Sequence, residues 1–276
     1  MAFFPVHEDY WDRPFGGNDN TNHLPYPLIC FLSGFFSVFM KVLFRFSVKN
    51  QESVRKFQGK KNGAVVVSPH VSYLDVIAMF LSVRPTQWVR LIGRDSLFEA
   101  AGGILGRILS HAGAFPIKRD EADRVALKRA ARMLKNGELV GIFPEGTRRG
   151  KGGRIPALHG GAALIARMGK APLLPLGLRN IDQVKQKGKF FRFPKITAVF
   201  GEPVALSSFD FLPKDERLDA CTWYVMREAF ALSRDVSPTE VNMKELFPES
   251  KDYTDIFAEH PIERFAVEDA PDYQAQ

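Results

Sequence analysis

The chain has 276 residues, of which 45% are hydrophobic, so it is long and apolar enough for one large domain with appendages. Its two cysteines, Cys30 and Cys221, exclude a disulfide framework and a cysteine-based metal site, and they fit a reducing compartment. The net charge of +7 is uneven, because residues 236–276 hold ten acidic and three basic side chains. The basic remainder favours anionic lipid or a phosphorylated substrate. We expect no nucleic-acid partner, because zinc-finger spacing, RNP-like aromatic motifs and repeats are missing from the sequence.

Residues 1–24 are polar and rich in Asn, Asp and Gly, and we expect them to be poorly ordered. The Phe-rich run PYPLICFLSGFFSVFMKVLFRFSV (25–48) follows, and its first charged residue is Lys41. That uncharged run is short for a membrane span, which needs about 20 residues. Lys41 and Arg45 lie four apart on one helical face, where both side chains can snorkel. The run therefore predicts a helix that lies in, or dips into, one leaflet, with a Phe-rich core helix as the alternative.

The stretch after this helix, up to residue 61, is strongly basic, which suits an anionic cytoplasmic leaflet. The positively charged n-region of a secretory signal does not precede the helix and no A-x-A-like site follows it, so it does not resemble such a signal. We therefore assign residues 25–61 to a membrane-associating helix and basic linker. The expected location is the cytoplasmic face of the cell membrane, held by a monotopic or single N-terminal anchor.

Short apolar runs alternate with helical patterns in residues 62–235. The expected strands lie at 63–68, 87–93, 113–118, 138–143, 172–178 and 196–201. The expected helices lie at about 72–81, 96–111, 120–136, 157–169 and 214–234. Such alternation predicts an α/β fold with a mixed, mostly parallel sheet flanked by helices, in which sites gather beyond the carboxyl ends of strands. The acidic tail, 236–276, is expected to be irregular, either packed over the body or loose.

The segment SPHVSYLDV follows the first expected strand and places a histidine five positions before a carboxylate. Ser72 and Asp75 have the S-x-x-D spacing of a helix N-terminus, and on that reading His70 is an ordinary loop residue. Residues five apart do not face each other on a helix, so His70 and Asp75 can touch only if the chain turns back before the helix. A carboxylate that fixes the tautomer of a histidine suits general base chemistry.

The motif FPEGTRRG comes directly after the expected strand ELVGIF. Gly146 lets the backbone approach a ligand, and Arg148 and Arg149 can bind phosphate in a bidentate manner. Glu145 can accept from a substrate hydroxyl, with Thr147 beside it. A solvated surface turn is the alternative. The neighbouring RGKGGR lacks the spacing of a nucleotide-binding P-loop, so we reject an NTPase.

A third element is GAFPIKRD, in which Lys118 and Arg119 follow an expected strand. They lie on the edge where a site would form. The alternative reading is that they are surface charges at the start of a helix.

Four motifs occur in one order: HVSYLD, GAFPIKR, FPEGTRRG and APLLPLGL. Over about residues 60–205 the chain thereby resembles the glycerolipid acyltransferase family, the enzymes similar to 1-acylglycerol-3-phosphate acyltransferase. Two departures from the family pattern stand out: Arg149 occupies a position where serine is common, and Leu158-His159 replaces a Phe-Lys pair. These departures suggest a phosphate pocket that is built differently.

The resemblance implies that His70 takes the proton from an acceptor hydroxyl and that Asp75 orients His70. The hydroxyl oxygen would attack the thioester of acyl-CoA or acyl-carrier protein as co-substrate, with no metal, no other cofactor and no acyl-enzyme. The sequence has no G-x-S-x-G nucleophile motif. The substrate-binding candidates are Lys118, Arg119, Glu145, Gly146, Thr147, Arg148 and Arg149.

The favoured acceptor is the lysophospholipid 1-acylglycerol 3-phosphate, which would give phosphatidate in phospholipid biosynthesis. The alternatives are another lysophospholipid, glycerol 3-phosphate or an amino-acid lipid as acceptor. A further alternative is a non-catalytic peripheral protein that binds anionic lipid, although lipid binding alone does not require the His70–Asp75 pair.

Overall fold

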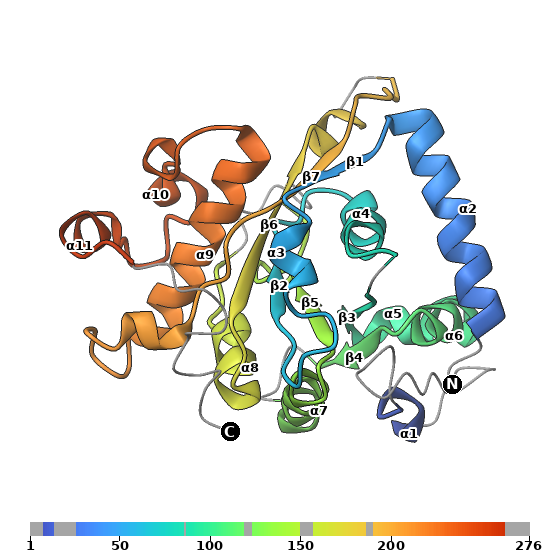
Figure 1. The fold of residues 1–276 in the computed structure, drawn as a ribbon, viewed down its shortest axis with the longest axis horizontal. Helices are drawn as coiled ribbons and strands as arrows, with labels where there is room; N and C mark the ends of the chain where they lie inside the picture. Colours follow the sequence, from blue (N-terminus) through green and yellow to red (C-terminus); the bar gives the residue numbers. More distant parts are fainter. Residues whose placement is uncertain are drawn as a thin grey trace.

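A seven-stranded sheet forms the centre of the molecule in this computed structural model, which describes residues 8–13, 26–85, 87–118, 123–149, 157–185 and 190–262 (Figure 1). The strands are β1 (Ser47–Lys49), β2 (Val65–Val67), β3 (Val89–Arg94), β4 (Phe115–Ile117), β5 (Leu139–Ile142), β6 (Leu173–Arg179) and β7 (Thr197–Phe200). Their order is β1-β7-β6-β2-β5-β3-β4, and only the β6–β7 pair is antiparallel. The predicted α/β class with a mixed, mostly parallel sheet is confirmed.

The middle strand β2 shows why the sheet is covered on both faces. Val65 and Val67 belong to one hydrophobic cluster and Val66 belongs to the other, because successive side chains of a strand point to opposite faces. All three are fully buried, as expected for a parallel strand between two helical layers.

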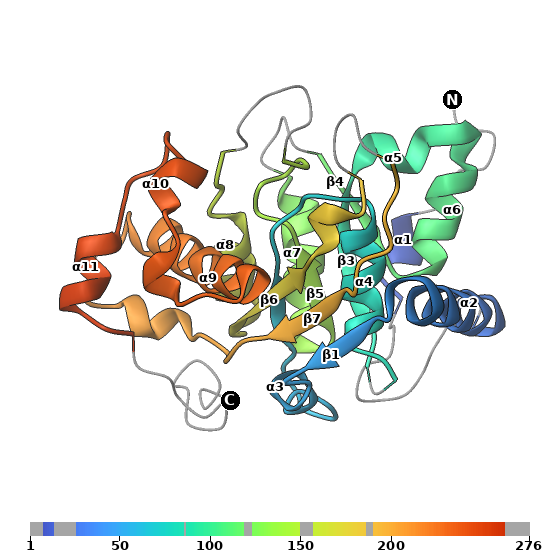
Figure 2. The same ribbon diagram turned by 90° about the horizontal axis from the view of Figure 1, so that it is seen from above.

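Helices form the two covering layers (Figure 2). The first cluster takes side chains from α7 (Arg124–Lys135), α8 (Gly161–Gly169) and α9 (Arg217–Arg234). The second takes side chains from α2 (Tyr26–Phe44), α3 (Glu52–Arg55) and α4 (Leu74–Ser82). The helix expected at 96–111 is divided into α5 (Asp95–Glu99), the 3₁₀ turn η1 (Ala100–Gly103) and α6 (Ile104–His111). Two further 3₁₀ turns, η3 (Ile181–Gln183) and η4 (Leu206–Phe209), follow β6 and β7.

The start of the sheet differs from our prediction. The Phe-rich helix ends at Phe44, where Arg45 takes a positive φ of 46°, and the chain continues as β1, parallel to β7. The sheet therefore begins within the segment 25–61, which we had assigned to a membrane helix and linker. The strand SVK has only three residues and follows a long helical pattern, so no local signal separates it.

Both faces of α2 are apolar. Its inner side contributes Met40 and Phe44 to the core, whereas Phe31, Phe35, Val38 and Val42 are 55–71% exposed. Their spacing of three or four residues places these four on one stripe. None of the helices in the described part of the chain is both long and apolar enough to cross a bilayer. The helix is confirmed, and its membrane association stays a prediction.

Residues 8–13 pack against the body, although we expected the whole segment 1–24 to be poorly ordered. They include the short helix α1 (Glu8–Trp11). The Trp11 indole N–H donates to Ser110 Oγ at 2.8 Å, and Asp12 forms ion pairs with Arg129 and Arg132. The buried Arg90 guanidinium donates to the backbone carbonyl oxygens of Trp11 and Arg13. These long-range partners, which composition cannot reveal, hold the segment in place.

The structure describes the acidic tail as far as residue 262. The tail contains η5 (Pro238–Glu240), α10 (Met243–Leu246) and α11 (Thr254–Glu259). Phe247, Tyr253 and Phe257 are buried in the same cluster as α9, so this segment packs over the body. Our expectation of irregular structure was wrong for these short helices, and residues 263–276 lie outside the described residues.

Candidate active site

Two neighbouring parallel strands bring the two main motifs together. In the β2–β5 pair Val67 is opposite Ile142, and His70 and Glu145 each follow three residues later. Because the strands are parallel, both segments leave the sheet at its carboxyl edge. The His70 backbone N–H donates to Glu145 Oε1 at 3.3 Å, and the Arg149 N–H donates to the His70 carbonyl at 2.8 Å.

His70 and Asp75 form the predicted pair. His70 Nδ1 lies 2.8 Å from Asp75 Oδ2, and the same oxygen accepts from the backbone N–H groups of Val71 and Ser72 at 2.6 and 2.8 Å. The chain turns back over the start of α4, which is the geometry that a five-residue separation requires. The helix-start reading holds for Asp75, which lies in the first turn of α4. Ser72 Oγ accepts from the Leu74 N–H at 3.2 Å, but the N-cap residue is Tyr73 and it has no side-chain cap hydrogen bond. The two readings describe the same turn.

The environment of the imidazole is asymmetric. Asp75 is fully buried, whereas the His70 side chain keeps 16% of its surface exposed. The Phe143 ring stacks on the imidazole with the ring centroids 4.3 Å apart. With Nδ1 turned towards the carboxylate, Nε2 is the ring nitrogen that remains for a substrate proton.

Glu145 and Arg149 form a second acid–base pair beside the first. Arg149 Nε and Glu145 Oε2 are 3.0 Å apart, an ion-pair separation whose angles fall outside hydrogen-bond geometry. Burial raises the pKa of Glu145 to about 7, and Arg149 and the His70 N–H only partly oppose this shift. Burial likewise lowers the pKa of Arg149, partly offset by Glu145.

The Arg149 side chain is directed towards α9 and the C-terminal segment. Its guanidinium lies over the rings of Phe230 and Phe247, at 5.0 and 4.5 Å from their centroids, and donates to the Leu246 carbonyl at 3.2 Å. The C-terminal segment therefore covers it. Since Glu145 and Arg149 have each other as partners here, their substrate-binding role stays a prediction.

The Arg148 guanidinium lies beside the turn at residues 70–75. Its guanidinium carbon is 3.6 Å from the centroid of the Tyr73 ring, which lies between His70 and Asp75 in the sequence and is 68% exposed. The preceding turn closes with the Gly146 N–H donating to the Phe143 carbonyl at 2.9 Å. Gly146 has a φ of 63°, which glycine adopts without a steric penalty. Thr147 is half-buried in this turn.

The third motif supplies Lys118 and Arg119. Lys118 is exposed at the end of β4, and its backbone N–H donates to Asp123 at 3.0 Å. From β2 to β4 there are three strand spacings, roughly 14 Å in all. Lys118 therefore lies farther along the carboxyl edge that carries His70. Arg119 lies outside the described residues.

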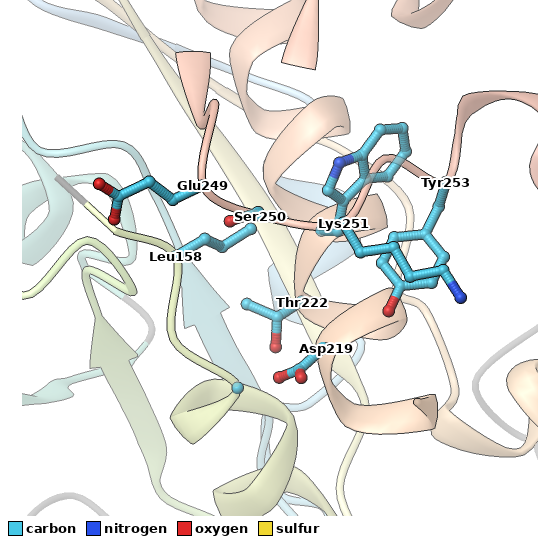
Figure 3. Close-up of a pocket in the computed structure, with 9 residues that line it drawn as sticks. Leu158, Asp219, Thr222, Glu249, Ser250, Lys251 and Tyr253 are labelled. Carbon is cyan, nitrogen blue, oxygen red and sulfur yellow. The ribbon is translucent and has the colours of Figure 1, made fainter. Parts of the chain in front are cut away.

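The structure also has a pocket away from the two motifs. None of the predicted site residues is among the described residues that line it. It lies between the start of α8, α9 and the C-terminal segment, where Leu158, Asp219, Thr222 and Lys251 line it (Figure 3). Lys251 Nζ donates to both carboxylate oxygens of Glu216 at 2.7 Å, so the cation of this pocket is already paired.

The aromatic side chains around the site were not predicted from the sequence. Phe143 packs on His70, Tyr73 on Arg148, and Phe230 with Phe247 on Arg149. Phe143 and Tyr73 lie inside the two motifs, and this position in the sequence could have indicated that they lie at the site. Phe230 and Phe247 are distant in sequence and had none. The described residues place no group of three His, Cys, Asp or Glu side chains that could hold a metal ion.

Comparison with known proteins supports the resemblance drawn from the motifs. The family model described as Acyltransferase matches residues 45–179. The 1-acyl-sn-glycerol-3-phosphate acyltransferase of Bacillus subtilis is 35% identical over 161 residues, which is 58% of this chain and 76% of that protein. The enzyme of the same name from Streptococcus pneumoniae is 29% identical over 55% of this chain and 54% of its own length.

The crystal structure of the 1-acyl-sn-glycerophosphate (LPA) acyltransferase PlsC from Thermotoga maritima has the same fold. It aligns with a TM-score of 0.52 at 23% identity, covering 74% of this chain and 79% of that one. The chain belongs to the glycerolipid acyltransferase family, as an enzyme similar to 1-acylglycerol-3-phosphate O-acyltransferases.

Proposed function

We propose that this enzyme transfers a fatty acyl group from acyl-CoA or acyl-carrier protein to the free hydroxyl of 1-acylglycerol 3-phosphate and so forms phosphatidate. The observation that carries the proposal is the His70–Asp75 pair, 2.8 Å apart, with its acid buried and its base partly exposed. The names of the relatives support the acceptor.

In the proposed reaction His70 Nε2 takes the proton of the acceptor hydroxyl while the oxygen attacks the thioester carbonyl carbon. Asp75 holds the tautomer and stabilises the imidazolium. The tetrahedral intermediate then collapses, the C–S bond breaks, and the imidazolium returns the proton to the leaving thiolate. An ester and a free thiol result, and His70 is regenerated as the base.

We propose that cationic side chains bind the phosphate of the acceptor. Arg148 is the described arginine beside the catalytic turn, and its planar guanidinium suits a dianionic phosphate. Lys118 and Arg119 are further candidates from the next motif. A phosphocholine head carries less negative charge and adds a cation that this cluster repels.

The test is competition between lysophosphatidate and lysophosphatidylcholine in mixed micelles, followed by thiol release from acyl-CoA. We expect clear preference for lysophosphatidate, and a higher apparent KM for it in Arg148→Ala. Arg167→Ala removes an exposed cation on α8, outside the membrane-associating segment, and serves as the matched control. Preference for the choline lipid, or indifference to Arg148→Ala, contradicts the acceptor while leaving acyl transfer standing.

We also propose that the enzyme acts at the cytoplasmic face of the cell membrane, held there by α2. A helix on a water-facing surface normally has a polar outer face, whereas the outer stripe of α2 is apolar. Lys41 lies in the last turn of α2, and Arg45 follows the end of the helix, so the two do not share a helical face as predicted. That pattern suits a helix lying in the interface, with its cations at anionic head groups. α2 contacts α4, the helix that carries Asp75, and Leu74 and Ile77 of α4 pack against the same hydrophobic cluster as the inner side of α2.

Substitution tests this anchor better than deletion, because deletion of α2 also removes Met40 and Phe44 from the core. Phe31→Ser/Phe35→Ser is expected to lower vesicle binding of the full chain without unfolding it. Unchanged sedimentation with vesicles contradicts the anchor.

A further inference from the structure

A second exposed aromatic cluster lies beside the C-terminal end of α2. Phe190, Phe191 and Phe193, which precede β7, are 94%, 63% and 51% exposed. Phenylalanine buries a large apolar area when it has a partner, so three exposed rings within four residues are unusual on a protein surface that meets only water.

The segment is fastened to the body. The Arg192 backbone N–H donates to the Val184 carbonyl at 3.0 Å, and Asn180 Nδ2 donates to the Lys195 carbonyl at 2.9 Å. A segment held at both sides presents its side chains in a fixed arrangement, which reduces the ordering cost of binding.

The cluster is also continuous with α2. Arg45 Nη2 donates to the Phe193 carbonyl at 2.8 Å, and the rings of Phe193 and Phe44 are 5.6 Å apart. Figure 1 shows the chain before β7 beside the end of α2 from which β1 begins. The apolar stripe of α2 and the aromatic cluster therefore meet at Arg45.

The charges around the cluster identify its partner. Lys185, Arg192 and Lys195 are exposed, and Lys185 Nζ lies 4.9 Å from the centroid of the Phe191 ring. Asp182 is the exposed acidic residue in the described part of this connection between β6 and β7. Aromatic rings interleaved with cations match the interface of an anionic bilayer, where rings insert at head-group depth and cations meet lipid phosphates.

We propose that Phe190, Phe191 and Phe193, with their flanking cations, form a second membrane contact that inserts into an anionic bilayer together with α2. This inference rests on the proposed membrane association. It adds a contact from a segment outside the Phe-rich N-terminal run. Two contacts fix the orientation of the enzyme on the surface, whereas one helix alone leaves rotation about its axis free.

The test measures binding of the full-length protein to vesicles of phosphatidylcholine and phosphatidylglycerol at 3:1, by sedimentation. Phe190→Ser/Phe191→Ser is expected to lower the partition coefficient about tenfold or more, because two largely exposed rings lose their burial in lipid. Phe211→Ser, at an exposed ring on the chain after η4, is the matched control and is expected to bind like the wild type. Arg192→Gln/Lys195→Gln is expected to weaken binding to these vesicles but not to pure phosphatidylcholine.

A spectroscopic measurement covers the case in which a serine variant folds poorly. Phe190→Trp is expected to shift its emission to the blue and to be quenched by brominated lipid, unlike Phe211→Trp. Wild-type binding by Phe190→Ser/Phe191→Ser, with no quenching at position 190, overturns the inference. If Phe31→Ser/Phe35→Ser then still loses binding, membrane association through α2 stands. A lipid-free dimer that Phe190→Ser/Phe191→Ser dissociates, seen by sedimentation velocity, also overturns it, because the cluster is then a protein interface.

Discussion

The pairs His70–Asp75 and Glu145–Arg149 lie at equivalent positions after the neighbouring strands β2 and β5, but their surroundings differ. His70 and Glu145 each follow their strand by three residues, and backbone hydrogen bonds join the two loops. In the first pair Asp75 Oδ2 receives two backbone N–H groups as well as His70 Nδ1, and the base keeps an exposed edge. In the second pair the carboxylate accepts one backbone hydrogen bond, and Arg149 is covered by the C-terminal segment.

The two pairs differ in whether the groups that hold them are local or distant in the sequence. The turn at residues 70–75 supplies the partners of Asp75 within six residues, so the pair is complete wherever the motif folds. Glu145 depends on a cation that Phe230 and Phe247 hold in place, and burial raises the pKa of Glu145 to about 7. We therefore propose that the first pair carries the chemistry and that the second supports the loop, while the substrate-binding role of Glu145 and Arg149 stays a prediction.

The largest expected effect is loss of the base. His70→Ala is expected to lower kcat by about a hundredfold or more, because general base catalysis contributes roughly 10² to 10⁴-fold. The measurement is thiol release from acyl-CoA with lysophosphatidate as acceptor, with circular dichroism to confirm the fold. A near-normal rate in a folded His70→Ala protein contradicts the mechanism.

Asp75→Asn tests whether the carboxylate works through the histidine. An amide can stabilise the wrong tautomer of His70, so we expect a loss of kcat of the same order with little change in KM. If kcat holds and only KM rises, Asp75 contacts substrate instead of orienting His70.

The second pair is expected to matter first for stability. Arg149→Met leaves the Glu145 carboxylate buried without its cation, and breaking a buried ion pair in this way costs up to about 3–5 kcal/mol at a pH well above 7, where Glu145 is ionised. Urea unfolding of Arg149→Met measures this cost. Arg149→Met/Glu145→Gln is expected to recover most of it, because both charges are then gone.

Arg148→Met is the matched control for that experiment. Its guanidinium stacks on an exposed tyrosine, and exposed cation–π contacts contribute about 0.5–1 kcal/mol. Equal destabilisation by Arg148→Met and Arg149→Met would show that the burial of Arg149 has no energetic consequence.

These residues also show where prediction from sequence succeeds. His70 and Asp75 could be paired because both partners lie in one turn, and the strand VVV could be found because β-branched residues fill a doubly covered strand. The partners of Arg149 could not be found, because Leu246 and Phe247 lie about a hundred residues away in a tail without helical periodicity. The strand β1 and the four-residue helix α10 each span little more than one period, which is too short for a repeating pattern to reveal.

The raised pKa of Glu145 predicts a specific dependence of stability on pH. The folded pKa of about 7 lies above the ordinary value of 4.5, so the unfolded chain binds fewer protons between these values. The contribution of Glu145 is complete below about pH 4.5 and is lost as the pH rises through 7, by at most about 3 kcal/mol. Glu145→Gln removes this titration, so its melting temperature relative to the wild type is expected to rise from pH 5 to pH 8. A constant difference across that range contradicts the raised pKa.

Ser72→Ala is expected to have the smallest effect, and it separates the two roles of the catalytic turn. Ser72 Oγ accepts one hydrogen bond, from the Leu74 N–H, whereas Asp75 Oδ2 accepts the N–H groups of Val71 and Ser72 as well as pairing with His70. Loss of one such hydrogen bond costs about 1 kcal/mol, so the melting temperature is expected to fall by about 2–4 °C. The turn that fixes His70 keeps its own hydrogen bonds in this variant, so kcat is expected to stay within about twofold of the wild type. Differential scanning calorimetry and the thiol-release assay on one preparation measure both quantities. A severe loss of kcat with an unchanged melting temperature would mean that the Ser72 hydroxyl acts in the reaction, and the assignment of the turn to Asp75 alone would then be wrong.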